Sequence, residues 1–190
     1  IQTKLEILDD EFQMRHRRNP IHHMQSRLKT IQSMLEKLKR KNYEVSINSA
    51  VKNLQDIAGI RVICSYVQDV YTIANLLVSQ DDVHLVRMAD YIREPKPNGY
   101  RSLHLIVEIP VFLSEGRILV PVEVQIRTIA MDFWASLEHS LRYKAQEYIP
   151  QHISDELQRV ATDIASLDQR MQAIHDQVDE LSDAHGDSAT

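Results

Sequence analysis

Two stretches of alternating apolar and polar residues, joined by a short turn, constrain the fold of this 190-residue chain most strongly. Residues 103–109 and 118–127 flank Glu115-Gly116, which predicts an antiparallel hairpin because successive side chains of a strand point to opposite faces. The alternation places three polar side chains on one face of the second strand: Glu123, Gln125 and Arg127. An acid, an amide and a guanidinium do not suit a hydrophobic core. They suit a metal ion, a base edge and a phosphate, so the hairpin is predicted to carry a functional site.

The remaining segments predict further strands and several helices around the hairpin. Strands are predicted at residues 57–64 and 83–92, and helices at 1–13, 26–41, 67–78, after Ser46 and after Thr128. The helix at 26–41 is based on a stripe of Leu28, Ile31, Leu35 and Leu38. For the helix after Thr128, the predicted inner stripe is Ile129, Phe133, Leu137 and Leu141. This order of elements favours an α+β fold, in which helices surround a small mixed sheet.

A different pattern begins at Pro150, where apolar residues recur in steps of three and four without Gly or Pro. They are Leu157, Val160, Ile164, Leu167, Met171, Ile174, Val178 and Leu181. This heptad pattern predicts a long C-terminal helix that pairs with another helix, from a second subunit. The alternative is a long helix that lies back on its own domain. We expect one domain at 1–150, the helix at 151–182 and a flexible tail at 183–190.

The charge distribution is more informative than the net charge of −5. Basic residues gather between Arg15 and Lys52, whereas acidic residues dominate after Pro150. The basic segment indicates an anionic ligand or an acidic partner, although single lysines of this kind are often only solvated. Cys64 is the only cysteine, which excludes an intramolecular disulfide and a cysteine zinc site. The chain has no apolar run of membrane-spanning length and no signal-peptide pattern, so we expect no membrane and a cytoplasmic location.

Asp56 and Arg61 flank the start of the predicted strand at 57–64. A carboxylate in this position either ends a helix or binds Mg²⁺, and its combination with Glu123 favours the metal. Arg61 lies among apolar residues, where a buried guanidinium needs a partner. It either forms a salt bridge with one of these carboxylates, or stacks on a base or holds a phosphate.

The loop at residues 96–104 carries polar and aromatic groups into the first strand of the hairpin. Tyr100 can stack on a nucleobase while Asn98 reads its edge. The alternative is that Asn98-Gly99 is only a turn and Tyr100 a core residue. His104 lies on the polar face of its strand, where it can bind phosphate or orient a carboxylate.

These segments together resemble the synthetase domain of the RelA/SpoT family. The resemblance extends over about 24–144 and rests on three motifs in order: DIAGIR at 56–61, KPNGYRSLH at 96–104 and EVQIRT at 123–128. It implies a stand-alone small synthetase of the stringent response, which transfers the β,γ-pyrophosphate of ATP to the 3′-hydroxyl of GDP or GTP and releases AMP. It also implies Mg²⁺ as cofactor and a homo-oligomer, most simply a tetramer.

The resemblance assigns roles to individual residues of this chain. Asp56 and Glu123 correspond to the catalytic acidic residues that hold the metal, and Glu123 is also a candidate base for the 3′-hydroxyl. The implied ATP-binding residues are Arg27, Lys29, Lys37, Lys41 and Arg61, with Lys37 and Lys41 expected on the same helix as Arg27. The implied GDP- or GTP-binding residues are Lys96, Asn98, Tyr100, His104, Gln125 and Arg127. Ala89 departs from the family pattern, because longer members carry Lys or Asp there.

Two other functions remain open from the residues alone. The basic segment at 15–52 can serve a regulatory module that binds single-stranded RNA or an allosteric nucleotide such as (p)ppGpp. A nucleotidyltransferase acting on a template or tRNA would release pyrophosphate in place of AMP.

Overall fold

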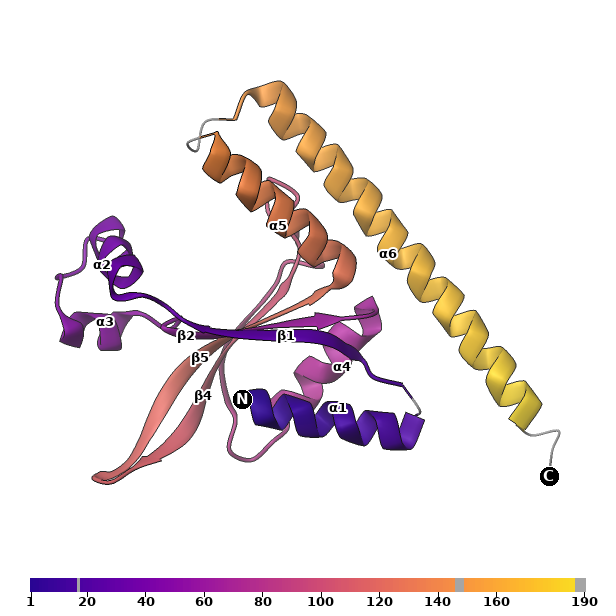
Figure 1. Cartoon of the computed structure of the whole chain (residues 1–190), viewed down its shortest axis with the longest axis horizontal. Helices are drawn as coiled ribbons and strands as arrows, with labels where there is room; N and C mark the ends of the chain where they lie inside the picture. The colour runs from indigo at the N-terminus through magenta and orange to yellow at the C-terminus, as the bar shows by residue number, and fades with distance from the viewer. Residues whose placement is uncertain (17, 146–148, 187–190) are drawn as a thin grey trace.

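A five-stranded mixed sheet forms the centre of the structure, a computed structural model that describes residues 1–16, 18–145 and 149–186 (Figure 1). The strands are β1 (Ile21–Leu28), β2 (Ala58–Cys64), β3 (His84–Asp90), β4 (Leu103–Leu113) and β5 (Gly116–Thr128). They lie in the order β1-β2-β5-β4-β3. β2 and β5 are parallel, and the other neighbours are antiparallel. The α+β prediction is confirmed, including the hairpin formed by β4 and β5.

The helices cover one face of this sheet and extend from its ends. They are α1 (Gln2–His16), α2 (Ile31–Arg40), α3 (Ile47–Asn53), α4 (Val67–Val78), α5 (Ile129–Lys144) and α6 (Gln151–Gly186). In Figure 1, α2 and α3 lie together at one end, and α6 runs as a long rod beside α5 and α4. Among the residues described, no helix combines the length and apolar character needed to cross a lipid bilayer.

The sheet has one apolar and one polar face, as the alternation predicts. Val122, Val124 and Ile126 of β5 are buried with α1 and α4 in the main core. The intervening residues of β5 point to the opposite face, because the side-chain period of a strand is two. At one end of that opposite face, Asp132 of α5 contacts Arg127 of β5. The strand alternation therefore places the candidate polar residues together on a face that α1 and α4 leave open.

The predicted helix at 26–41 is wrong at its beginning. Residues 26–28 belong to β1, a strand that the sequence analysis did not predict, and Arg27 pairs with Gly59 of β2. α2 begins only at Ile31, after Thr30 accepts a hydrogen bond from the backbone N–H of Ser33 as N-cap. Leu28 is 75% exposed, so it does not belong to an inner helical stripe. Pairing with β2 overrides the local helical period, as long-range contacts often do.

The predicted inner stripe of α5 is also wrong. All four of its members are 46–58% exposed: Ile129, Phe133, Leu137 and Leu141. The buried face of α5 instead carries Met131, Trp134, Ala135 and Glu138. The helix boundary was predicted correctly, since Thr128 is the N-cap and accepts from the backbone N–H of Met131. Two apolar faces exist on this helix, and the structure buries the one that contains Trp134.

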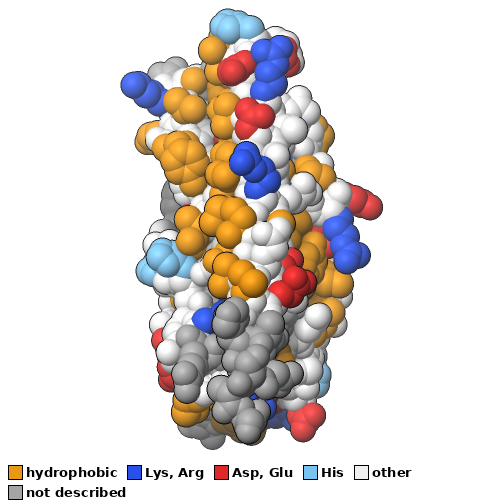
Figure 2. Space-filling model, turned by 90° about the vertical axis from the view of Figure 1, so that its right-hand side faces the viewer, with side chains coloured by type: hydrophobic (Ala, Val, Ile, Leu, Met, Phe, Trp, Pro, Cys, Tyr) orange, Lys and Arg blue, Asp and Glu red, His pale blue; other side chains and the backbone are white. Residues whose placement is uncertain are grey.

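The long C-terminal helix adopts the alternative arrangement, in which it lies back on its own domain. Ala161 and Asp168 are buried against the domain, so α6 does lie back on its own chain. The heptad residues Leu167, Met171 and Ile174 remain 44–53% exposed. Figure 2 shows hydrophobic side chains in a column along the face of the molecule on which α6 lies. α6 also continues to Gly186, four residues beyond its predicted end, and the rest of the predicted tail lies outside the described residues.

Candidate active site

Strand pairing aligns the predicted polar residues in two neighbouring rows across the sheet. Gln125 of β5 pairs with Arg61 of β2 on one side and with His104 of β4 on the other. In the next row, Glu123 of β5 pairs with Gly59, which in turn pairs with Arg27 of β1. Gly59 has no side chain between these two, so Arg27 and Glu123 face a common space. The site is therefore built from four of the five strands.

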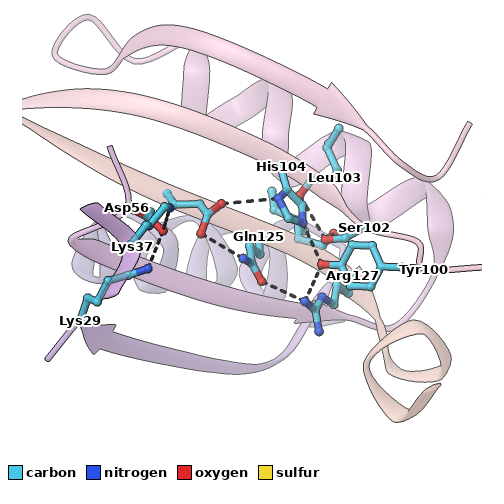
Figure 3. A network of polar contacts seen from close by, with 11 residues as sticks. Lys29, Lys37, Asp56, Tyr100, Ser102, Leu103, His104, Gln125 and Arg127 are labelled. Carbon is cyan, nitrogen blue, oxygen red and sulfur yellow. Dashed lines mark hydrogen bonds and ion pairs between the residues drawn. The ribbon is translucent and has the colours of Figure 1, made fainter. Parts of the chain in front are cut away.

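Five side chains of this face form a closed ring of polar contacts (Figure 3). Arg127 donates through Nη2 to Tyr100 Oη at 2.6 Å and to Gln125 Oε1 at 2.9 Å. Gln125 donates through Nε2 to Glu123 Oε2 at 3.0 Å. His104 closes the ring, with Nε2 at 2.8 Å from Tyr100 Oη and Nδ1 at 3.5 Å from Glu123 Oε1. Arg127 has only donors, so the Tyr100 hydroxyl accepts from it and remains free to donate to His104.

The ring controls the ionisation of Glu123. The hydrogen bond from His104 lowers the pKa of Glu123, and the amide of Gln125 acts in the same direction. Burial opposes both, but the pKa of Glu123 still lies below its ordinary value. Glu123 is therefore an ionised carboxylate at neutral pH, which can accept a proton or bind a cation.

A second carboxylate lies at the mouth of β2 and is held by two lysines. Asp56 Oδ2 accepts from Lys29 Nζ at 2.6 Å and from Lys37 Nζ at 2.5 Å. Burial disfavours the charge on Asp56, but the hydrogen bonds from both lysines outweigh it and lower the pKa of the carboxyl. The other oxygen, Oδ1, is buried and has no hydrogen-bond partner among the described residues. Asp56 thus presents one free carboxylate oxygen beside a cluster of positive charge.

Asp132 joins the site from α5, and the sequence analysis did not identify it. Its Oδ1 accepts from Arg127 Nη1 at 3.0 Å and lies 3.5 Å from Arg61 Nη1. Burial and the neighbouring Arg127 lower the pKa of Arg61, and Asp132 offsets part of that effect. The salt bridge considered for Arg61 was with Asp56 or Glu123, whereas its ion pair is with Asp132. The position of Asp132 one turn after the N-cap Thr128 was the available signal, since a helix start often carries an acid.

These residues surround a cavity of about 370 Å³. Its lining residues are Gln25, Arg27, Lys29, Asp56, Gly59, Ile60, Arg61, Glu123, Gln125, Arg127 and His139. Gln25 and His139 were not predicted. Lys41, predicted beside Arg27 on one helix, caps the C-terminus of α2 and is exposed, whereas Arg27 is on β1. The structure therefore gathers Arg27, Lys29 and Arg61 at the cavity and leaves Lys41 outside it.

The loop before β4 is connected to this cavity through Tyr100, whose hydroxyl accepts a hydrogen bond from the lining residue Arg127. Lys96 Nζ lies 4.6 Å from the ring centroid of Tyr100 and the same distance from that of Tyr91. Asn98 accepts from the backbone N–H of Tyr100 and donates to Glu138 of α5, so its amide helps to shape the loop. Tyr100 is partly buried and packs against Trp134 and its neighbours. The two interpretations of this loop, turn and ligand contact, are compatible in the structure.

Ala89, noted above for its departure from the pattern of the resembling family, lies in the same row across the sheet as His104, Gln125 and Arg61. It is on β3 and pairs with His104 of β4. A longer side chain at residue 89 would stand beside His104, so this position adjoins the ring of polar contacts.

The fold and the site define a class of protein that handles highly phosphorylated ligands, because lysines and arginines converge on two carboxylates in one cavity. The profile described as "Region found in RelA / SpoT proteins" matches residues 26–148, and the chain belongs to this family.

Relatives from Bacillus subtilis are similar over nearly the whole chain. "GTP pyrophosphokinase YwaC" is 45% identical over 94% of this chain and 85% of its own length. "GTP pyrophosphokinase YjbM" is 39% identical over 97% of this chain and 82% of its own length.

Solved structures show the same fold. The crystal structure of small alarmone synthetase 2 from Bacillus subtilis has a TM-score of 0.84 at 44% identity, and the match covers 93% of this chain and 90% of that one. Small alarmone synthetase 1 from the same organism, bound to its product pppGpp, also gives 0.84, at 38% identity over 93% and 89% of the two chains.

Proposed function

We propose that this chain is a (p)ppGpp synthetase, which transfers the β,γ-pyrophosphate of ATP to the 3′-hydroxyl of GDP or GTP and releases AMP. Family membership and the relatives named GTP pyrophosphokinase support this activity. The observation in this chain that carries the proposal is the placement of Glu123. Its ionised carboxylate is connected to the loop of Tyr100 through His104, and it lines the cavity that contains Arg27, Lys29 and Arg61.

The cationic side of the cavity is assigned to ATP. Arg27 and Arg61 present planar guanidinium groups, which can stack on a purine or form bidentate hydrogen bonds to phosphate. Lys29 and Lys37 supply point charges for the phosphates and already hold Asp56. Lys41 is assigned to a longer-range role at most, because it lies outside the cavity and is exposed.

The loop side is assigned to the guanosine nucleotide. Tyr100 offers an aromatic face for the base, and Lys96, beside that ring, offers charge for the 5′-phosphates. Asn98 holds the loop that carries both. Gln125, Arg127 and His104 fix the hydroxyl of Tyr100 and the carboxylate of Glu123 relative to each other.

Glu123 is assigned as the base. It accepts the proton of the 3′-hydroxyl while that oxygen forms a bond to the β-phosphorus of ATP. The bond between the β-phosphorus and the oxygen that bridges to the α-phosphorus breaks, and AMP leaves with that oxygen. Reactions of this kind depend mainly on positioning and on neutralising phosphate charge, and the arginines and lysines supply that charge here.

The donor set fits Mg²⁺, which is proposed as the cofactor. Asp56 Oδ1 is buried without a partner among the described residues, and Glu123 is an ionised oxygen donor in the same cavity. No group of three or more His, Cys, Asp or Glu residues in the described part of the chain forms a metal cage. Mg²⁺ commonly uses one or two carboxylates plus the phosphates of its nucleotide, so two are enough. When bound, it would neutralise charge on the transferring pyrophosphate.

A matched pair of variants tests the assignment of Glu123. Glu123→Gln keeps the shape of the side chain but removes the base, so ppGpp formation from ATP, GDP and Mg²⁺ should fall by at least about 100-fold. Glu108→Gln changes a carboxylate of β4 outside the cavity and should keep normal activity. Product is measured by chromatography, and circular dichroism confirms that both variants are folded. Substantial activity of Glu123→Gln would remove Glu123 from the mechanism.

Assembly is the second part of the proposal: the chain forms a homo-oligomer, a tetramer by analogy with its family. Two apolar stripes are exposed on neighbouring helices: Phe133 and Leu137 on α5, and the heptad residues of α6 other than Leu157 and Ile164. Long exposed apolar stripes of this kind mark an interface. We propose residues 1–150 as the catalytic domain and 151–182 as the principal assembly segment, with a cytoplasmic location, where its nucleotide substrates occur.

An additional anion-binding surface is proposed on α2 and α3. Its exposed basic residues are Lys39, Arg40, Lys41 and Lys52, which lie outside the cavity. Single-stranded RNA or (p)ppGpp as an allosteric ligand fits this charge. A steep loss of RNA affinity with added salt supports the first ligand, because backbone phosphate contacts release counterions. A flat salt response counts against it.

A further inference from the structure

The helix α6 contacts the loop that carries Lys96, Asn98 and Tyr100, called here the acceptor loop. A side chain at Gly99 would stand 2.5 Å from Ala161 Cβ of α6, so the two backbones approach as closely as their side chains permit. Tyr100 packs against the buried cluster formed by Trp134 and Ala135 of α5 and Ala161 of α6, as do Leu157 and Ile164 of α6. The loop that carries Tyr100 therefore has α6 as one of its walls.

A buried carboxylate of α6 lies at the centre of this contact. Asp168 Oδ2 accepts from Thr128 Oγ1 at 2.8 Å, and Arg101 Nη1 lies 3.9 Å from the same oxygen. The side chain of Asp168 is only 8% exposed and that of Arg101 only 11%. Thr128 is also the N-cap of α5 and the last residue of β5. One carboxylate thus joins α6, the junction of β5 with α5, and the residue next to Tyr100.

The pair is a poor source of stability but a good constraint on position. Burial raises the pKa of Asp168, and Thr128 and Arg101 offset that effect only in part. Buried ion pairs often add little to stability, whereas removal of one partner leaves a costly unpaired charge. Arg101 Nη1 is buried and has no hydrogen bond within the described part of the chain, so Asp168 is the nearby anion that favours its burial. Without Asp168, we expect the guanidinium to move toward water and to carry the neighbouring Tyr100 with it.

We propose that Asp168 is a positioning residue for the guanosine acceptor: through Arg101 it holds the loop of Tyr100 in the shape that binds GDP or GTP. The proposal rests on the synthetase function proposed above, with the guanosine nucleotide on the Tyr100 side. It gives α6 a role beyond assembly, because the same helix that carries the exposed heptad stripe also supports the acceptor loop. Assembly and acceptor affinity are therefore linked through one helix.

The test compares the Michaelis constants of both substrates in the full chain. Asp168→Asn retains an oxygen that can accept from Thr128 but removes the charge opposite Arg101. We expect the KM for GDP and GTP to rise about tenfold, which corresponds to about 1.4 kcal/mol, while the KM for ATP stays within about twofold. Asp168→Glu, which restores the charge, should recover part of the acceptor affinity.

Gln172→Ala is the matched control on the same helix. Gln172 accepts from the backbone N–H of Gln68, so this variant loosens α6 from the start of α4 and does not touch the acceptor loop. It should leave both KM values unchanged. If Asp168→Asn does not fold, Ala161→Val tests the same wall by pressing on Gly99, with the same expected rise for the acceptor alone.

The outcomes separate this inference from the function on which it rests. An unchanged acceptor KM in Asp168→Asn, or an equal rise for ATP and acceptor, would overturn the positioning role while wild-type activity upheld the synthetase. The same changes in Gln172→Ala would also overturn it, since they would show only a general loosening of α6. If wild type binds GDP without forming product, calorimetric GDP affinities of the same variants decide the inference. If wild type neither reacts nor binds GDP, both proposals fall.

Discussion

At the scale of single residues, the site depends on which side chains keep others charged and in place. Glu123 is ionised because His104 and Gln125 stabilise its charge against burial. Asp56 is ionised because Lys29 and Lys37 do the same. Alternation along β5 predicted Glu123, Gln125 and Arg127 on one face, which is a local property of the sequence. Asp132 was not predicted, because its contact with Arg61 depends on how α5 packs on the sheet.

The pH dependence of the reaction tests the link between His104 and Glu123. A carboxylate base works only when ionised, so the rate falls as the pH drops through its pKa. His104→Ala removes the hydrogen bond that lowers the pKa of Glu123 and leaves the effect of burial, so that pKa should rise. The acid limb of kcat against pH should therefore move to higher pH. His84→Ala, at an exposed position of β3, should leave the limb in place. An unmoved limb in His104→Ala would show that Glu123 does not limit the rate.

At the scale of elements, the errors of the sequence analysis share one cause. Residues 26–41 have a helical period, but their first three form an edge strand because β2 offers backbone partners to β1. α5 is apolar on two faces, and only the packing of Trp134 against Leu157 of α6 decides which one is buried. The spacing of apolar residues within each segment shows neither the pairing of β1 with β2 nor the buried face of α5. By contrast, α4 and the N-caps Ser46 and Thr128 were predicted correctly, since their signals are local.

A pair of glycine variants tests the tight turn before β4. Gly99 has φ +88° and faces Ala161, so Gly99→Ala meets both backbone strain and a collision. It should lower the free energy of unfolding by about 1–3 kcal/mol and raise the acceptor KM. Gly116 has φ +132° but open space around it, far along the hairpin from the site. Gly116→Ala should therefore lower stability without changing either KM, measured by thermal melting and initial rates. Identical kinetics for the two variants would contradict the role of the turn.

At the scale of the whole molecule, apolar side chains lie exposed along the neighbouring helices α5 and α6. The heptad pattern predicted an interface on α6, and the structure leaves most of that stripe exposed (Figure 2). Two of its members, Leu157 and Ile164, instead pack toward α5. The contact of α6 with its own domain was only the alternative prediction, because the heptad spacing alone does not show which surface the helix covers. The sequence pattern does not distinguish Asp168 and Ala161 from other residues of α6. Their contacts with Arg101 and Gly99 become apparent only in the structure.

A charge placed on the stripe tests the proposed assembly. Ile174→Glu puts a carboxylate on an apolar, 53% exposed position of α6, which would be costly inside an interface. Light scattering at micromolar concentration should show a smaller particle than wild type, with unchanged circular dichroism. Gln169→Glu adds the same charge at an exposed position outside the heptad stripe and should assemble normally. A wild type that is already a monomer would refute the oligomer.

The most direct test of the central claim follows the phosphorus atoms of ATP. The folded protein is incubated with GDP, Mg²⁺ and ATP that is labelled at the β-phosphorus, and the products are separated by chromatography. Transfer of pyrophosphate predicts that the label appears in ppGpp, with one unlabelled AMP formed for each ppGpp. Label released as free pyrophosphate, or retained in ADP, would contradict the account, as would the absence of product from protein that binds both nucleotides.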